Sequence, residues 1–308
     1  MPSSVIRRFE YQEAARRLDI EFVTGRRYSY HDVPAQLVRD MRAARSRGQF
    51  FNRYIRDHFR FTRTDVSRLR VGTAGWSLPT ADREHFPSDG SSLARYAERF
   101  PVTEINSSFH RPHRRSTYER WAATVGSDFR FSVKLPRTIT HQARLADCEE
   151  ALAAFIEQIG GLGERLGVLL VQLPPSLALD PKVALSFFSA LRAQSRAAIA
   201  CEPRHLSWFS AEANALLADA GVARVAADPA LAPEASVAGG WPELRYIRLH
   251  GSPLVYKSSY GEEKLGALAA FLGAEGNEAD TWCIFDNTAR NAAIPDALLL
   301  QRLTSEGP

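Results

Sequence analysis

LRYIRLHG, residues 244–251, is a short apolar stretch whose last positions carry the charged Arg248 and the imidazole of His250. The chain repeats this pattern eight times after residue 68, in LRVGTAGW (69–76), VTEINSSFH (102–110), FRFSVKLP (129–136), GVLLVQLPP (167–175), AIACEPRH (198–205), ARVAADPA (223–230), LRYIRLHG (244–251) and TWCIFDNT (281–288). Stretches long enough for a helix separate them. Eight strand–helix units in roughly 240 residues are typical of a TIM-like (β/α)₈ barrel. The sequence therefore predicts an α/β barrel.

Barrels of this kind place their chemistry at the C-terminal ends of the strands. Alternate residues of a strand share a face, so Arg248 and His250 point the same way as Tyr246, and Glu202 the same way as Arg204. A charge within a buried strand is costly unless it is paired or lies at the barrel mouth. The pattern favours a polar binding or catalytic mouth over a purely structural network of ion pairs. The polar strand-end residues are Glu104, Asn106, Lys134, Gln172, Glu202, Arg204, Asp228, Arg248, His250 and Asp286.

The barrel sequence also carries specific motifs, among them VGTAGWS, FPVTEINSSFHRPHRRSTYERWA, FRFSVKLPRTITHQARL, CEPRHLSWF, YIRLHGS and FDNTARNAAIPDALLL. With these motifs, residues 69–302 resemble the YecE-like family, domain of unknown function number seventy-two. The resemblance implies a TIM-barrel-like fold and no established activity. The family often has Tyr after the aromatic residue of the second motif, where this chain has His110 after Phe109.

Three interpretations of the mouth remain open. The first is acid–base chemistry without a metal, with Glu104 or Glu202 as the general base and Lys134 as an acid or electrostatic stabiliser. Arg204, Arg248 and His250 would then hold an anionic group of the substrate. We expect catalysis to involve Glu104, Lys134, Glu202, Asp228 and His250. Asp286 receives no catalytic role, because an Asp-Asn pair at a strand end often only caps the next helix.

The second interpretation is a divalent-metal site built from Glu104, Glu202, Asp228 and His250, as in a metal-dependent hydrolase or isomerase. No compact ligand motif supports it, and neighbouring cations would compete for the carboxylates, so we predict no metal ligand. The third is a binding protein without catalysis, in which aromatic side chains stack on a ligand. The substrate contacts expected at the mouth and in its loops are Trp76, Asn106, Phe109, Arg111, His141, Gln172, Arg204, Trp208, Arg248, Tyr256, Tyr260 and Asn287.

The N-terminal segment differs in charge from the barrel. Residues 1–64 contain 14 arginines, no lysine and seven acidic residues, a net charge of +7, whereas the remainder has 25 basic and 28 acidic residues, a net charge of −3. Strands are expected at 4–9, 17–23 and 26–30, with a helix from Asp32 that Gly48 ends, a second helix over 50–59 and a polar linker over 62–68. These elements predict a small α+β domain.

This segment resembles the KTSC domain, the C-terminal type of lysyl-tRNA synthetases, through SSVIRRFEY, Tyr28-Ser29-Tyr30, DVP and GQFFNRYIRDHF. The resemblance and the positive charge suggest RNA or tRNA as a partner. Arg26, Arg27, Tyr28 and Tyr30 are the expected nucleic-acid contacts, with the arginines on phosphates and the tyrosines stacked on bases. The alternative is that the two tyrosines pack against the helix.

The bulk composition is that of a globular protein, with 45% hydrophobic and 24% charged residues and three cysteines in no metal-binding or disulfide pattern. The domains expected are 1–64 and 65–308. Without a signal-like N-terminus or an 18-residue apolar run, we expect a cytoplasmic protein with no membrane partner. The partner class expected is an anionic small molecule or nucleic acid. The cofactor, the substrate, the reaction and the oligomeric state stay open.

Overall fold

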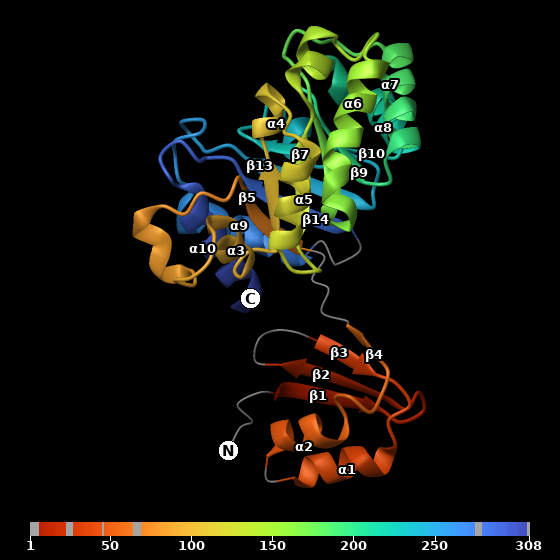
Figure 1. Ribbon diagram of the computed structural model, residues 1–308, viewed down its shortest axis with the longest axis vertical. Coiled ribbons are helices and arrows are strands. Elements are labelled where there is room, and N and C mark those ends of the chain that lie inside the picture. Colours follow the sequence, from red (N-terminus) through yellow and green to blue (C-terminus); the bar gives the residue numbers. More distant parts are fainter. Residues whose placement is uncertain (1–5, 23–26, 45, 64–68, 275–278, 307–308) are drawn as a thin grey trace. The chain divides into compact units, whose positions relative to one another are not determined.

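A computed structural model of the chain describes residues 6–22, 27–44, 46–63, 69–274 and 279–306. The chain divides into two compact units, Met1–Ser67 and Arg68–Pro308, each coloured continuously along the sequence in Figure 1. The first is a small α+β unit and the second is a barrel.

The N-terminal unit is a four-stranded antiparallel sheet in the order β1-β2-β3-β4, with two helices on one face (Figure 1). Its elements are β1 Ile6–Gln12, β2 Arg17–Phe22, β3 Arg27–Tyr30, α1 Ala35–Ala43, α2 Arg47–Tyr54 and β4 Phe61–Arg63. Strand β2 alternates as the sequence predicts, because Leu18 and Ile20 are buried and pack with Val38, Met41 and Phe51 of the helices.

Two details of this unit differ from the prediction. Strand β4 occupies part of the segment expected to be a linker. The first helix, expected to run from Asp32 to Gly48, ends earlier, because α1 stops at Ala43. The second helix, expected over 50–59, is α2, which begins at Arg47, where the Ser46 hydroxyl caps it by accepting a hydrogen bond from the Gln49 amide, so Gly48 is buried within α2.

The second unit is a mostly parallel, near-closed barrel, which confirms the predicted fold (Figure 1). The strand order is β11-β13-β14-β5-β6-β7-β8-β9-β10-β12. The strands are β5 Leu69–Ala74, β6 Val102–Ile105, β7 Arg130–Lys134, β8 Leu166–Gln172, β9 Ala198–Glu202, β10 Val222–Arg224, β11 Ala226–Asp228, β12 Gly239–Gly240, β13 Leu244–Leu249 and β14 Asp280–Phe285.

The sixth strand is where the barrel departs from a regular pattern. It is split into β10, which pairs with β9, and β11, which pairs with β13. The connection from Asp228 to Leu244 contains only a short 3₁₀ turn, Pro233–Ser236, and strand β12, which pairs antiparallel with β10. Three prolines and the Gly239-Gly240 pair in this connection disfavour a helix, which explains why the helix expected here does not form.

An α-helix follows each of the other strands, and Figure 1 shows these helices around the barrel. They are α3 Ser92–Ala97, α4 Ser107–His110, α5 Arg115–Thr124, α6 Glu149–Ile159, α7 Pro181–Gln194, α8 Ala211–Asp219, α9 Gly261–Ala274 and α10 Ala293–Glu306. Among the described residues, no helix is both long enough and apolar enough to cross a membrane.

Alternation along the strands produces two separate cores. Outward-facing side chains such as Val133, Ile199 and Cys283 pack with the helices. Inward-facing side chains fill the barrel with Val102, Val168, Leu170, Ala200, Ala223, Val225, Leu244, Tyr246, Trp282 and Ile284. Gly167 leaves room for Trp282, because a Cβ atom there would lie 2.8 Å from the indole ring. These inward-facing apolar side chains fill the barrel interior below the C-terminal ends of the strands. The charged residues of the strand ends therefore lie in the next layer, towards the mouth.

Candidate active site

Five ionisable side chains meet inside the barrel where the strands end. Glu104 lies on β6, Glu202 on β9 and Arg248 on β13, while His250 and Asp286 directly follow β13 and β14. The first four are at most 1% exposed and Asp286 is 8% exposed. The strand alternation predicted that Glu104, Glu202, Arg248 and His250 share this layer.

Arg248 is the centre of the cluster. Its Nη2 and Nε atoms donate to Glu104 Oε1 at 2.6 Å and Oε2 at 3.1 Å, its Nη1 donates to Glu202 Oε2 at 2.5 Å, and Nη2 also donates to Asp286 Oδ2 at 2.9 Å. Burial alone would lower the pKa of Arg248, but the three carboxylates raise it well above its ordinary value. Because its nitrogens are fully engaged, Arg248 holds the carboxylates rather than a substrate anion.

Glu104 is equally occupied. Besides the two-pronged contact with Arg248, its Oε2 accepts a 2.7 Å hydrogen bond from the Tyr246 hydroxyl, which lies 2.8 Å from Ser132 Oγ. Burial, followed by the charge of Glu104, raises the pKa of Tyr246 well above its ordinary value. The carboxylate of Glu104 is therefore held by Arg248 and Tyr246 within the ion network.

His250 bridges two carboxylates through its two ring nitrogens. Nδ1 lies 3.0 Å from Asp286 Oδ2, and Nε2 lies 2.9 Å from Glu202 Oε1 and 2.9 Å from Arg204 Nη2. Burial lowers the pKa of His250, but the hydrogen bonds with Asp286 and Glu202 outweigh burial and raise it. The imidazolium donates to both carboxylates, and the neutral ring can accept from Arg204 at Nε2. Either protonation state therefore has partners, which suits a group that exchanges a proton.

The two carboxylates beside His250 are held ionised. Burial tends to raise the pKa of Glu202, but Arg248, His250 and Arg204 lower it well below its ordinary value. The pKa of Asp286 is likewise raised by burial and lowered further by Arg248 and His250. Both groups act as acceptors and negative charges near neutral pH rather than as acids.

Lys134, at the end of β7, is the exception in this layer. It is 9% exposed, and among the described residues no hydrogen-bond acceptor or carboxylate contacts its ammonium group. Its Nζ atom lies 4.2 Å from the centre of the Phe109 ring. Burial and then the positive charge of Arg248 lower the pKa of Lys134. An amine of this kind is available to react or to bind, whereas the other charges of the cluster are already paired.

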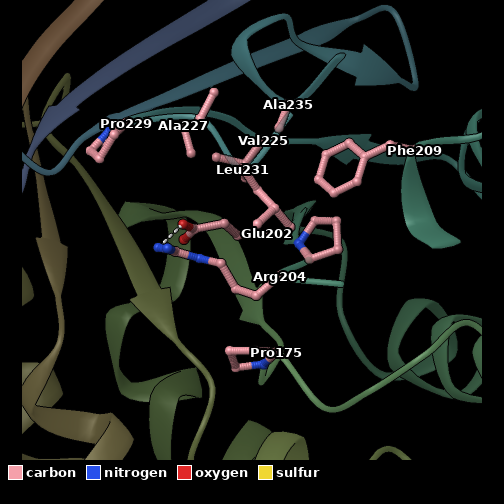
Figure 2. A pocket seen from close by; sticks show the side chains of 11 residues that line it. Pro175, Glu202, Arg204, Phe209, Val225, Ala227, Pro229, Leu231 and Ala235 are labelled. Atoms are coloured by element: carbon pink, nitrogen blue, oxygen red, sulfur yellow. Dashed lines mark hydrogen bonds and ion pairs between the residues drawn. The ribbon is translucent and has the colours of Figure 1, made fainter. Parts of the chain in front are cut away.

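A pocket of ≈ 300 Å³ opens beside Glu202 and Arg204 (Figure 2). The Arg204 guanidinium donates to the Glu202 carboxylate, but its buried Nε atom has no hydrogen-bond partner among the described residues. The other lining residues are Pro175, Pro203, Phe209, Val225, Ala227, Pro229, Ala230, Leu231 and Ala235. Arg204, whose side chain is 28% exposed, is therefore a second cation of the site, besides Lys134, that can offer a donor to a ligand.

Several expected substrate contacts adjoin the cluster. Asn106 Nδ2 donates to Asp286 Oδ1 at 3.4 Å, and Gln172 Nε2 donates to Glu202 Oε2 at 3.3 Å. The Tyr256 ring packs edge-on against His250 with centroids 5.8 Å apart. Phe109 covers Lys134, and the His141 ring packs against Phe109 at 5.0 Å. These residues extend the cluster towards the solvent side.

Other expected contacts lie apart from the cluster. Trp76 packs against Trp121 with ring centroids 5.0 Å apart. Arg111 is exposed and lines a separate hollow of ≈ 480 Å³ together with Ser107 and His113, whose Oγ and Nε2 atoms are 2.7 Å apart. The sequence analysis did not single out this serine–histidine pair.

Four predicted residues have structural contacts instead. Asp228 Oδ1 accepts a 2.9 Å hydrogen bond from the Tyr260 hydroxyl, so neither residue reaches the ion cluster. Trp208 is 1% exposed and its indole donates to the Leu177 carbonyl at 2.9 Å. Asn287 is fully buried and donates to Asp296 at 2.7 Å. Tertiary packing, which strand ends alone do not reveal, gives these side chains hydrogen-bond partners outside the ion cluster.

Asp286 has more contacts than the predicted helix cap implies. It contacts both Arg248 and His250, although its place before an asparagine suggested only a helix cap. The signal was available in the alternation, because Trp282 and Ile284 face the barrel interior and Asp286 continues their series.

The cluster does not have the form of a metal site. Within the described residues, no group of three or more His, Cys, Asp or Glu side chains is placed to hold a metal ion. The carboxylates proposed as ligands are bound by arginines, and Asp228 is turned to Tyr260. The donor set of this chain therefore fits an ion-pair network better than a divalent cation.

In the N-terminal unit, some of the expected nucleic-acid contacts are exposed and others are buried in the core. Arg26 lies outside the described residues. Tyr30 is 3% exposed and belongs to the core, whereas Tyr28 is half-buried and its ring packs against Phe22 and the exposed Phe61. Arg27 is exposed and forms a 3.3 Å ion pair with Glu21. Tyr30 thus has the packing role that was the alternative.

The raised pKa of His250 predicts a pH-dependent contribution to stability. The folded protein binds this proton more tightly than the unfolded chain, so the contribution is fully present below pH 6.5 and is lost as the pH rises through the higher folded-state pKa. Urea titrations followed by tryptophan fluorescence give the free energies of unfolding of the wild type and of His250→Gln. The difference between the two free energies should shrink with rising pH by up to about 1.4 kcal/mol per pH unit. Parallel pH curves would contradict this, and exposed His110→Gln is the control variant.

Comparison with known proteins agrees with the two units. The model of the protein family of unknown function DUF72 matches residues 70–307, and the KTSC domain model matches residues 2–59. The solved structure of a DUF72 family protein from Enterococcus faecalis superposes with a TM-score of 0.64 at 20% identity, over 78% of this chain and 96% of that protein. This likeness supports the barrel fold.

Two curated proteins each share sequence with part of the chain. YecE of Escherichia coli K12 is 30% identical over 143 residues, 46% of this chain and 50% of YecE, so the chain spans about half the length of that relative. A lysine–tRNA ligase of Nostoc punctiforme is 41% identical over 58 residues, 19% of this chain and 10% of the ligase.

Proposed function

This chain belongs to the DUF72 family over residues 70–307, and from that premise we propose that the barrel is an enzyme that abstracts a proton from a small anionic substrate at the C-terminal ends of its strands. The observation that carries the proposal is Lys134, a nearly buried amine that forms no ion pair with any residue the structure describes and lies next to a paired ion network. Burial and the nearby charge of Arg248 lower the pKa of Lys134, which raises the fraction of the neutral amine that can act as a general base.

The other groups have complementary roles in this proposal. Arg204, whose partly exposed guanidinium lines the pocket, binds the anionic group of the substrate. Glu202 and Asp286 favour the charged form of His250, which can then donate a proton to the substrate from Nε2, the ring atom that faces Glu202. Arg248 fixes all three carboxylates, so the charges keep their positions when a substrate enters.

Deuterium incorporation tests the proposal without knowledge of the final product. The full chain is incubated in D₂O with a panel of carboxylic acids, phosphate esters and nucleotides, and exchange at carbon is followed by NMR. We expect time-dependent exchange for at least one anion. If members of the panel bind but none of them exchanges deuterium at carbon, the result would favour a non-catalytic binding protein.

Elemental analysis of protein purified without chelator tests the metal-free chemistry. We expect no divalent metal in stoichiometric amount, because arginines occupy the carboxylates. A stoichiometric metal that is lost in Glu202→Ala would overturn this part of the proposal in favour of a metal-dependent hydrolase or isomerase.

RNA binding by the N-terminal unit is a second candidate function. The net charge of +7 in residues 1–64 supports it, as does the similarity of this unit to part of a lysine–tRNA ligase. Exposed Arg27, together with Phe61 beside Tyr28, offers a cation and aromatic surface for a single strand.

Filter binding or fluorescence anisotropy of the full chain with tRNA checks this candidate. The logarithm of affinity should fall linearly with the logarithm of salt concentration, and Arg27→Gln with Phe61→Ala should weaken binding at least about tenfold. Arg120→Gln on helix α5 is the matched control for a loss of charge elsewhere. Absence of binding at low salt, or equal losses in both variants, would exclude the candidate.

A further inference from the structure

The pocket beside Glu202 and Arg204 is apolar on nearly every side. Figure 2 shows the two charged side chains directed towards one another, with Val225, Leu231 and Pro229 among the apolar side chains around them. Resting on the proposed function, we infer that the substrate is an amphipathic carboxylate, with its acid group on Arg204 and an aliphatic or aromatic body of a few carbons in this pocket.

The hydrogen bonds of the Arg204 guanidinium indicate that the ligand carries an acid group. Its Nη2 atom is held by Glu202 and His250, but the buried Nε has no partner among the described residues. Because that Nε atom is closed off from the pocket, a ligand carboxylate reaches the guanidinium at its outer Nη1 edge, where the side chain is 28% exposed and no hydrogen bond is made among the described residues. Glu202 is ionised at the same spot, and its negative charge disfavours a phosphate dianion more than a carboxylate monoanion.

The residues that line the pocket indicate that the rest of the ligand is apolar. Phe209, Val225, Ala227 and Leu231 offer carbon atoms but no charge to a ligand, and the volume of ≈ 300 Å³ is that of a small-molecule site. Each methylene transferred from water into such a pocket raises affinity about fourfold. A sugar phosphate or a nucleotide would place hydroxyl groups against these walls without partners.

A homologous series of acids tests the inference on the full chain. Acetate, butanoate and hexanoate are titrated by isothermal calorimetry, and we expect the affinity to rise about fourfold per methylene. Inorganic phosphate should bind more weakly than butanoate, and Arg204→Gln should weaken hexanoate at least tenfold. An affinity that does not depend on chain length, or tighter binding of phosphate, would overturn the inference.

Two leucine substitutions show whether the alkyl chain of the ligand binds in this pocket. Leu231→Ser, at the pocket wall, should reduce the gain per methylene, whereas Leu206→Ser, an exposed leucine outside the lining, should preserve it. Equal slopes in both variants would place the alkyl chain elsewhere and refute the assignment.

The same titrations on Lys134→Met separate this inference from the proposed function. Chain-length dependence in that variant supports the pocket assignment even if no exchange chemistry is found. Exchange confined to phosphate esters, with no chain-length dependence, would leave the enzyme proposal standing and reject the pocket assignment.

Discussion

Replacement of Arg248 by Gln is expected to lower the free energy of unfolding of the barrel by about 3–5 kcal/mol. Arg248 is fully buried and contacts Glu104, Glu202 and Asp286 at once. The variant leaves three buried carboxylates with too few donors, and the loss of one partner from a buried ion pair costs more than the pair itself contributes.

Tryptophan fluorescence measures this effect in the full chain. All five tryptophans lie in the barrel unit and none in residues 1–64, so the signal reports barrel unfolding alone. The expected loss corresponds to a decrease in melting temperature of roughly 6–20 °C. Arg248→Lys should recover only part of it, because an ammonium group cannot make the two-pronged contact with Glu104.

The control for Arg248 is Arg111→Gln, which removes an exposed arginine outside the cluster and should change stability by less than about 0.5 kcal/mol. Equal stability of Arg248→Gln and the wild type would show that the carboxylates find water or other donors. The network would then contribute little to the fold.

The second large effect is on catalysis. Lys134→Met should reduce proton exchange on the substrate by about 10²–10⁴-fold, because it removes the proposed general base. The same variant should keep or slightly raise the melting temperature, since it replaces a nearly buried, unpaired amine with an apolar chain of similar length. Opposite changes in activity and stability distinguish a catalytic lysine from a structural one.

Three further measurements sharpen the test of Lys134. The wild-type rate should rise with pH through the lowered pKa of Lys134, as the amine form becomes populated. Lys134→Arg should stay inactive, because a guanidinium does not release its proton, and added methylamine should partly restore Lys134→Ala. The exposed Lys182→Met is the control. Full exchange activity in Lys134→Met would remove the amine from the mechanism.

Local sequence was sufficient for most of the barrel. Strand alternation placed Glu104, Glu202, Arg248 and His250 in one inward-facing layer, because parity along a strand is a local property and parallel strands end at the same rim. The same alternation places Asp286 in this layer, although its position before an asparagine predicted only a local capping role. The helix missing after β11 was also visible in the prolines and glycines of that connection.

What the sequence determined by itself is therefore the set of charges at the barrel mouth; their roles were decided only by the tertiary structure. Glu104 and Arg248 became support because contacts with Tyr246, Glu202 and Asp286, far away in the chain, use up their hydrogen-bonding atoms. Among the described residues, no acceptor contacts the ammonium group of Lys134, and the contacts of Arg204 with Glu202 and His250 use only its Nη2 atom, so both side chains retain donors. Residue type and strand position specify which atoms reach the mouth, whereas pairing between distant strands determines which of them remain available to a ligand.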